Sequence, residues 1–523
     1  MPRSKKTKDS FKRDEQGRAI LGSAKEMAEW VKLGFKEQDA RNTPDIPFKQ
    51  HYIDLSNCVL YISYPIGSKE HTSEIFNLCH MAGIVPGIEK IEGNPNFLFE
   101  VKYDIHLDGS LLYGNFFHYV KFDGTVRMEN VIVRSTFSCF KCVFMDYVYM
   151  QHIHITGRSD FEQCEFRKGL VLTGGKSDLF HFNNCKVDNR LWLSSVNLDN
   201  QNHEGYHQSI EVTNSKVENL KLSKIHTNGL PVYIGDSQIN GMHVDGVTLD
   251  SSLCFYSCTL EGVMTAVTEN EGQRNRIKEL VFHSCELDGQ YHIESTDIDK
   301  LDFNFCKIGD KGRLRLAKCG IKNLTAGCSS VFGQLDVLEN EISSICLEGT
   351  CVQGFLNFQG NKVDKYTDRQ TIRLLKNEAL KVNDQVEATK LYAKEMNMLL
   401  ADKDIPCSDK VSLRLNKCFS KFGVSWGRSL WVTLLLSVVL TVLMLGCGSA
   451  KYGFNLSGGF MGIGNFVTAL LDSINVFSIP LFSDTIKEYG LNVLGQVLYF
   501  LIKVVVAYGT YQFVVAFRKY GRN

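Results

Sequence analysis

The stretch FEQCEFRKGLVLTGGKSDLFHFNNCKV, residues 161–187, carries the same short motif at both of its ends. In each copy an apolar residue is followed three positions later by a cysteine, and a second apolar residue follows that cysteine at two positions. The two cysteines, Cys164 and Cys185, are 21 residues apart. Alternate residues within each copy are apolar, and this period of two is typical of β-strands. A strand motif that returns after a fixed interval predicts a repeat architecture.

The motif recurs from about residue 110 to residue 365, and most steps between copies are 21 or 22 residues. Longer steps coincide with polar insertions at 199–208 and 268–278, and one short step, from Cys306 to Cys319, indicates a shift by about half a turn. A fainter half-repeat follows 10 or 11 residues later, as Val196 follows Cys185. The central position is always Cys, Ser or Asn; its members are Cys142, Cys164, Cys185, Ser215, Ser237, Cys258, Cys285, Cys306, Cys319, Asn340 and Asn361.

Short strands at this spacing, with no helices between them, predict a mainly β fold, a parallel β-helix or solenoid over residues 110–365 with one turn per repeat. About twelve turns would form a rod roughly 55–60 Å long at the spacing of neighbouring strands. We expect the small central residues to stack inside the narrow coil, where cysteine acts as a small hydrophobe and asparagine amides form ladders. The alternative is zinc binding, but Cys139 and Cys142 form one C-x-x-C pair with no second pair at ligand spacing.

Composition places the chain in a reducing compartment. It has 17 cysteines among 523 residues, and most of them occupy the repeated position. The first residues are basic and polar with no apolar signal segment, so we expect reduced thiols in the cytosol. Lysine plus arginine equals aspartate plus glutamate at 58 each, so nothing in the overall charge indicates nucleic acid as a partner.

The segments on either side of the repeats contain helix signals. Residues 1–22 are predicted to be a polar arm and residues 23–109 an N-terminal α/β cap region, in which Ser23 and Glu26 form a capping box at the start of a helix over 23–35. The apolar face of that helix would pack on the next domain or contact a membrane surface. Residues 366–404 predict an αα-hairpin with Asp368 and Asp384 as N-caps, covering the last coil.

The C-terminal part predicts a membrane domain. Residues 405–428 form a basic juxtamembrane segment, residues 429–448 carry no charge and are long enough to span a bilayer, and a second apolar segment covers 491–517. Residues 429–523 are therefore a predicted two-span helical domain in contact with the lipid bilayer. Basic residues flank the outer ends of both spans, so we expect both termini in the cytoplasm and the spans in a bacterial inner membrane.

Lys503 lies within the second apolar segment and has two interpretations. A charge inside a membrane is by default a candidate functional residue. Alternatively, the true span is about 491–507, and Lys503 reaches the cytoplasmic interface beside Tyr508 and Tyr511.

Residues 460–484 between the spans are apolar and helix-like at first and then irregular, which predicts a re-entrant loop. Residues 369–523 resemble the C-terminal part of bacterial membrane-bound pentapeptide-repeat proteins, whose repeats lead into a two-helix, potassium-channel-like pore domain. The hairpin sequence RLLKNEALKVNDQVEATKLYAKEM and the pore loop carry this resemblance. The family's loop follows S-x-x-T-F-T-T-x-G-[FY]-G-D, and the candidate pore-loop residues here are Ser473, Phe477, Ser478, Ile479, Pro480, Leu481, Phe482, Ser483 and Asp484.

The loop departs from the family pattern at its centre. Ser473, Phe477, Ser478, Phe482 and Asp484 fall on matching positions, but Leu481 and Ser483 replace the filter glycines and follow a proline. A potassium filter needs backbone geometry that glycine permits, so we expect no potassium selectivity. The resemblance leaves three outcomes: a non-selective pore, a pore that opens only when triggered, and a relic used as an anchor.

These features predict a cytoplasmic solenoid that acts as a sensing or interaction module, coupled to a degenerate channel-like pore and binding a protein partner on its surface. A homo-tetramer follows from the pore plan, and a membrane effector in antiviral defence is one role that fits. The alternatives are a non-conducting membrane-anchored scaffold and, third, a β-helix enzyme. Asp297, Asp299 and Asp302 are better explained as acidic turn residues than as a catalytic cluster. We expect no enzymatic activity, no cofactor and no metal.

Overall fold

The computed structural model describes residues 7–41, 52–61, 87–90, 97–113, 117–198, 208–266, 274–446, 460–475 and 491–518. The chain divides into two compact units, Met1–Thr367 and Asp368–Asn523. The first unit is mainly β and the second is helical.

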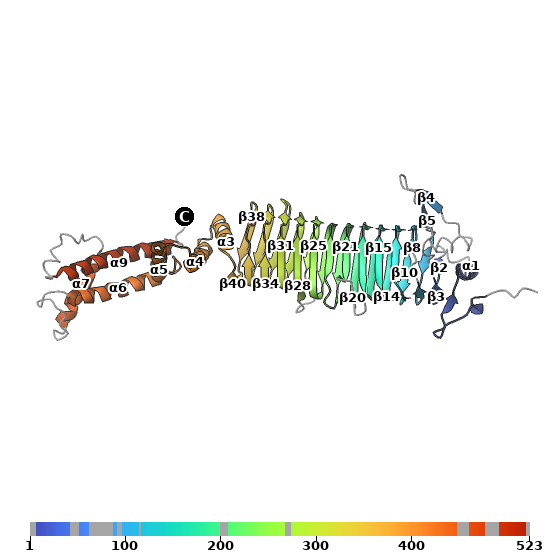
Figure 1. The fold of residues 1–523 in the computed structure, drawn as a ribbon, viewed down its shortest axis with the longest axis horizontal. Coiled ribbons are helices and arrows are strands. Elements are labelled where there is room, and N and C mark those ends of the chain that lie inside the picture. The colour runs from blue at the N-terminus through green and yellow to red at the C-terminus, as the bar shows by residue number, and fades with distance from the viewer. Residues whose placement is uncertain are drawn as a thin grey trace, which may run out of the picture. The chain divides into compact units, whose positions relative to one another are not determined.

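The first unit is a parallel β-solenoid of about eleven turns over residues 105–366, which confirms the predicted fold class. Successive turns stack along the solenoid (Figure 1). Their strands pair in parallel and in register, as Glu165 with Lys186 and Phe166 with Val187. One face is a twelve-stranded sheet in the described residues. Its strands are β8 (Phe117–His118), β12 (Phe137–Phe140), β15 (Arg158–Glu162), β18 (Leu179–Asn183), β21 (Ile210–Thr213), β23 (Val232–Gly235), β25 (Thr248–Tyr256), β28 (Asn275–His283), β31 (Thr296–Asn304), β34 (Gly320–Thr325), β37 (Glu341–Cys346) and β40 (Lys362–Tyr366).

The remaining described strands belong to a second, larger sheet that includes the N-terminal strands. They are β1 (Ala19–Leu21), β2 (Tyr52–Asp54), β3 (Cys58–Tyr61), β4 (Gly87–Lys90), β5 (Phe97–Val101), β6 (Asp104–His106), β7 (Leu111–Tyr113), β9 (Val120–Phe122), β10 (Val126–Glu129), β11 (Ile132–Val133), β13 (Val143–Phe144), β14 (Val148–Ile155), β16 (Glu165–Phe166), β17 (Leu170–Ser177), β19 (Lys186–Val187), β20 (Leu191–Leu198), β22 (Lys216–Ser223), β24 (Gln238–Asp245), β26 (Thr259–Leu260), β27 (Val263–Ala266), β29 (Glu286–Leu287), β30 (Gln290–Glu294), β32 (Lys307–Ile308), β33 (Arg313–Ala317), β35 (Ser330–Val331), β36 (Gln334–Leu338), β38 (Cys351–Val352) and β39 (Phe355–Gln359).

Left-handed residues mark two corners in each turn of the solenoid. At the first corner each of these residues precedes the repeated small position, and φ is close to +50° at most of them. This column contains Lys141, Gln163, Asn184, Asn214, Asp236, Ser257, Ser284, Phe305, Cys328 and Gly349. The second column lies about half a repeat later and contains Asn130, His152, Gly174, Ser195, Lys224, Gly246, Ser295, Lys318, Glu339 and Gly360. The half-repeat in the sequence is therefore the second corner of the coil.

The small residue after each left-handed position of the first column points inward and bonds to the backbone. The Sγ of Cys185, for example, donates to the Phe161 carbonyl of the preceding turn at 3.2 Å. Asparagines extend this pattern, since the Asn340 side chain donates to the Leu316 carbonyl at 3.0 Å and accepts from the Cys319 backbone N–H at 2.8 Å. Of the predicted stacked positions, Asn361 is half-buried. The others are buried: Cys142, Cys164, Cys185, Ser215, Ser237, Cys258, Cys285, Cys306, Cys319 and Asn340.

The short step from Cys306 to Cys319 has a structural explanation. The first column continues from Cys306 to Ser329 and then Thr350, whose hydroxyls bond to carbonyls of the preceding turn. Cys319 belongs to the second column, after Thr296 and before Asn340. In this part of the solenoid small residues follow the left-handed position at both corners, while the coil itself keeps its period. Burial raises the pKa of the Cys319 thiol to about 11, so this thiol is protonated at neutral pH.

The N-terminal residues are more ordered than the predicted polar arm. Ala19–Leu21 form β1, which pairs in parallel with β3, and Ala19 and Leu21 are fully buried because they face the end of the solenoid core. Helix α1 (Ala24–Ala40) begins at the predicted cap, where the Ser23 hydroxyl accepts from the Glu26 N–H. The indole N–H of Trp30 donates to the Asp54 carbonyl at 3.1 Å, so the apolar face of α1 packs on the solenoid.

The second unit contains helices α3 (Arg369–Lys381), α4 (Gln385–Ala401), α5 (Cys407–Ser420), α6 (Trp426–Gly446), α7 (Phe460–Ile474) and α9 (Val493–Arg518). The first two form the predicted hairpin, with Asp368 and Asp384 accepting hydrogen bonds from backbone N–H groups at their starts. Glu395 of α4 is buried and accepts hydrogen bonds from Arg373 and Lys376 of α3. This cluster fixes the register between the two helices.

Candidate functional site

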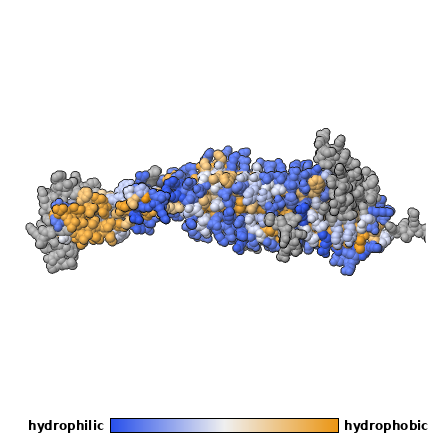
Figure 2. All heavy atoms as spheres, in the orientation of Figure 1, coloured by the Kyte–Doolittle hydropathy of each residue, from blue (hydrophilic) through white to orange (hydrophobic). Residues whose placement is uncertain are grey.

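Helices α6 and α9 are long and apolar enough to cross a membrane. Only 33% of the most apolar 18-residue stretch of each helix is buried. The core helix of a soluble protein would be mostly buried. Their exposed side chains include Trp431 at 72%, Leu435 at 63% and Val493 at 78%. Figure 2 shows hydrophobic residues gathered over these helices, whereas the visible face of the solenoid is largely hydrophilic. The protein is therefore a β-solenoid followed by a helical unit with two candidate membrane spans.

The two spans pack closely because a glycine lies at their contact. A Cβ atom added to Gly509 of α9 would lie 1.9 Å from the Oγ1 of Thr433 on α6. The Ser429 hydroxyl of α6 also donates to the Gly509 carbonyl at 3.0 Å. Small and hydroxyl residues at a helix contact are typical of helix pairs in membranes.

Helix α7, which lies between the spans in the sequence, packs against both of them. Its Ala469 is buried in a cluster with Met444 and Leu445 of α6 and with Ile502 and Val506 of α9. The structure thus places the first part of the predicted re-entrant segment as a short helix against the two spans. At 15 residues, α7 is too short to cross a bilayer, which needs about 20 residues.

Lys503 holds the carboxyl-terminal end of α7. Its Nζ donates to the backbone carbonyls of Asp472 and Asn475, both at 2.7 Å, and only 7% of the residue is exposed. The same ammonium lies 5.0 Å from the ring centre of Tyr499, one turn earlier on α9. The Tyr499 hydroxyl lies 3.5 Å from an Asp472 carboxylate oxygen. Lys503, Tyr499 and Asp472, together with the end of α7, make up what we call the lysine site.

The electrostatics of the lysine site follow from the helix end. The last carbonyls of a helix have no partner within the helix and carry partial negative charge, which favours a cation. The Lys503 ammonium supplies that cation from within the chain. Lys503 is therefore a buried charge whose hydrogen bonds go to the end of α7, and its position relative to a membrane stays a prediction. Tyr508 packs instead on Phe419 of α5.

Most of the predicted pore-loop residues are not among the residues that the structure describes. Ser473 lies in the last turn of α7. Phe477, Ser478, Ile479, Pro480, Leu481, Phe482, Ser483 and Asp484 lie outside the described residues. Sequence inspection did not single out Asp472 or Tyr499. The signal available for Tyr499 was its spacing of four residues from Lys503, which places both side chains on one helix face.

In the described part of the chain, no group of three or more histidine, cysteine or acidic side chains is placed to hold a metal ion. Comparison with protein-family models, with curated proteins and with solved structures finds no match to this chain. The function is therefore argued from the solenoid, the candidate spans and the lysine site.

Proposed function

We propose that this protein is a membrane-anchored β-solenoid, which serves as a sensing or interaction module coupled to a degenerate, channel-like pore. The observation that carries the proposal is the short helix α7, which packs against both candidate spans and has its carboxyl-terminal end held by a buried lysine. Such a helix between two spans matches the plan of a re-entrant pore helix. Irregular backbone after it would be tolerated only where it lines a cavity or is buried in protein.

The lysine site suggests why the pore would rest closed. In membrane transport proteins, the carboxyl ends of short helices stabilise cations through their free carbonyl groups. Here the Lys503 ammonium takes up two such carbonyls, those of Asp472 and Asn475. A permeating cation would therefore compete with a cation that is covalently part of the chain. Opening requires Lys503 to leave α7 or α7 to move.

A physical connection links the two candidate spans to the helices that precede them, which we place on the cytoplasmic side. The Ser420 hydroxyl at the end of α5 donates to the Gln512 side chain of α9 at 2.8 Å, and both residues are buried. Helix α5 follows the α3–α4 hairpin and precedes α6, so a force on the hairpin reaches both spans through it.

We place the solenoid and both termini in the cytoplasm of a bacterium, with the spans in its inner membrane, because basic residues flank the outer ends of the spans. A homo-tetramer, a protein partner on the solenoid and a role as a membrane effector complete the proposal.

Cation flux into liposomes that contain the purified full chain tests the proposal. Replacing Lys503 by methionine should raise flux above wild type, because it removes the competing charge and keeps a side chain of similar length. The Lys503→Arg variant keeps the charge and should stay at the wild-type level. Thermal unfolding of each variant in detergent separates a gain of flux from loss of the fold. Absence of flux from both wild type and Lys503→Met, with and without cell extract, would refute the pore.

The second candidate function is a non-conducting scaffold with a membrane anchor. The observation that favours it is that Lys503 satisfies backbone carbonyls, which is also a purely structural way to fix α7. This scaffold predicts that exchanging residues 425–523 for an unrelated two-span anchor preserves biological activity. Loss of activity on that exchange, with the hybrid still in the membrane, would favour the pore.

A further inference from the structure

A hollow of about 500 Å³ lies on one face of the solenoid, across the turns that contain β20, β22, β24 and β27. Its outward residues form two columns along successive turns. Trp192 pairs in register with Lys221, and Lys221 with His243, in one column. Asn219 pairs with Gly241 in the neighbouring column. Because Gly241 has no side chain, that column is interrupted, and the hollow opens there.

The hollow joins an aromatic ring to positive charge. Lys221 Nζ lies 4.9 Å from the ring centre of Trp192, and the guanidinium carbon of Arg190 lies 5.7 Å from it. Among the described residues neither Arg190 nor Lys221 forms an ion pair with a carboxylate. His243 lines the same hollow. Two basic groups that lack a carboxylate partner beside a concave surface favour an anionic ligand.

The indole N–H of Trp192 does not contribute to the hollow. Its Nε1 atom is buried and has no acceptor within the described part of the chain, and a ligand in the hollow cannot reach a buried atom. The hollow therefore offers a ring face and two cations within one small volume.

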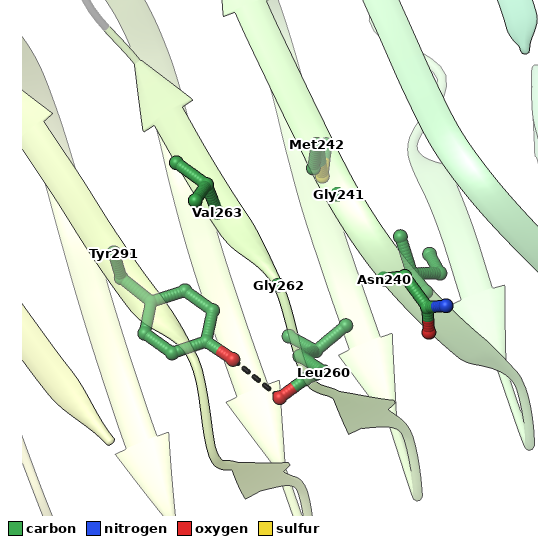
Figure 3. A pocket seen from close by; sticks show the side chains of 8 residues that line it. Asn240, Gly241, Met242, Leu260, Gly262, Val263 and Tyr291 are labelled. Atoms are coloured by element: carbon green, nitrogen blue, oxygen red, sulfur yellow. Dashed lines mark hydrogen bonds between the residues drawn. The ribbon is translucent and has the colours of Figure 1, made fainter. Parts of the chain in front are cut away.

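The neighbouring void in Figure 3 is a poor alternative site. It measures about 10 Å³, room for about one water. Tyr291 of β30 points into this region, and its hydroxyl already has a partner because it donates to the Leu260 carbonyl. Of these two neighbouring cavities, the larger hollow is the one with the volume of small-molecule sites, roughly 300–1,000 Å³.

We propose that this hollow binds a nucleoside phosphate. A nucleobase is planar and stacks on an indole, whereas a phosphate suits Arg190 and Lys221 because charge-assisted hydrogen bonds to oxyanions are strong. The flexible stem of Lys221 lets its ammonium move from the ring to the phosphate. Stacking is tolerant of base identity. The site therefore indicates a nucleoside phosphate as the class of ligand and does not select one base. Binding here does not depend on whether the helices conduct.

Isothermal titration calorimetry of the full chain in detergent tests this site with AMP, GMP, CMP and UMP. We expect saturable binding, weakened about tenfold when ribose 5-phosphate replaces the nucleotide, since the stacking term is lost. Lys221→Gln should weaken binding about tenfold as well, by removing one charge-assisted bond. Gly241→Val should abolish binding by filling the hollow. A Cβ at this position lies 2.6 Å from Asn219 Oδ1 and 3.4 Å from the Glu218 carbonyl oxygen, so the Asn219 side chain must shift to admit it.

The matched control is Lys216→Gln, which removes an exposed lysine from the same strand but outside the hollow and should bind like wild type. Thermal unfolding of every variant identifies loss of the fold. Failure of all four nucleotides to bind, or wild-type affinity in both Lys221→Gln and Gly241→Val, would overturn the site. Binding of a single-stranded oligonucleotide without binding of any mononucleotide would also overturn it.

Discussion

At the scale of single residues, the solenoid depends on pairs of positions at its corners. The first residue of each pair has a positive φ, which costs a residue with a side chain roughly 1–2 kcal/mol. At the first corner the second residue of each pair is small and buried, and its side chain bonds to a carbonyl of the preceding turn. Where the chain turns a corner, some backbone groups lose their hydrogen-bond partners in the sheet. The side-chain bond satisfies such a group, so the identity of the small residue matters as well as its size.

Asn340 provides a test of this bonding. Replacing it by leucine keeps the volume roughly constant but leaves the Leu316 carbonyl and the Cys319 N–H without their partners. We expect a loss of about 3 kcal/mol, since each buried unpaired group costs about 1–3 kcal/mol. Urea unfolding of the full chain in detergent measures it. A loss below about 1 kcal/mol would mean that only packing matters at this corner.

His181 gives the solenoid a predicted dependence on pH. It lies between Asp160 and Glu211 on neighbouring strands, with Nδ1 3.5 Å from Asp160 Oδ1, and the nearby Asp160 carboxylate raises the pKa of His181. The folded state therefore favours the protonated imidazole. The resulting stability is fully present below the unfolded pKa of about 6.5 and disappears as the pH rises through the raised folded value.

Replacing His181 by glutamine should accordingly lower the melting temperature more at about pH 6 than at about pH 9. Melting curves of both proteins across this range make the comparison. Equal losses at both ends of the range would show that the charge of His181 contributes nothing.

At the scale of elements, two helix pairs organise the second unit by different physics. The α3–α4 hairpin is held by the buried Glu395 between Arg373 and Lys376. Burial raises the pKa of Glu395, but the hydrogen bonds from Lys376 and Arg373 outweigh burial, so its net pKa is lowered. The α6–α9 pair instead relies on the close approach at Gly509. A polar cluster sets the pairing of α3 with α4, whereas close packing at a glycine sets the pairing of α6 with α9.

The Glu395→Gln variant should lose about 2 kcal/mol, because hydrogen bonds to a charged group contribute about 1.5–3 kcal/mol. Glu387→Gln is its control, since Glu387 pairs with Lys390 on the exposed side of α4 and should change stability by less than about 0.5 kcal/mol. Denaturation followed by the helical signal measures both. Similar losses in the two variants would contradict a special role for the buried cluster.

Gly509→Ala should destabilise the span pair by about 1–3 kcal/mol, because the new methyl group overlaps Thr433. Gly427→Ala on α6 is the control, since a Cβ there meets nothing within 4 Å. Thermal unfolding in detergent compares them. If both alanines leave the protein equally stable, the spans do not approach as closely as the structure has them.

At the scale of the whole molecule, the chain combines a solenoid, built almost entirely from contacts between successive turns, with a helical unit whose apolar surface is largely exposed. Exposed apolar helices need a nonaqueous environment, which a bilayer supplies. The proposed topology puts α5, with its exposed Cys407 and Cys418, on the cytoplasmic side.

A membrane-impermeant maleimide should therefore leave Cys407 unmodified in intact spheroplasts and modify it in inverted membrane vesicles. A permeant maleimide, which should modify Cys407 in both preparations, is the control for its reactivity. Modification of Cys407 by the impermeant reagent in intact spheroplasts would reverse the orientation.

The sequence by itself determined the solenoid, its period and the two apolar helices. These properties depend on local patterns: a motif that returns every 21 or 22 residues, alternation within strands, and charge-free segments of sufficient length. The caps at Ser23, Asp368 and Asp384 were also predictable, since capping acts over three residues. The strand at Ala19–Leu21 was missed, because its partner β3 lies almost forty residues away.

Only the tertiary structure decided how distant residues meet. It divided the small residues between two corners, because the side of a coil occupied by each depends on the whole path of the turn. It brought Lys503 to the end of α7, a contact between residues about thirty positions apart that no local period encodes. It also assembled Arg190, Trp192 and Lys221 around the gap at Gly241, since stacking of successive turns sets which side chains share a face.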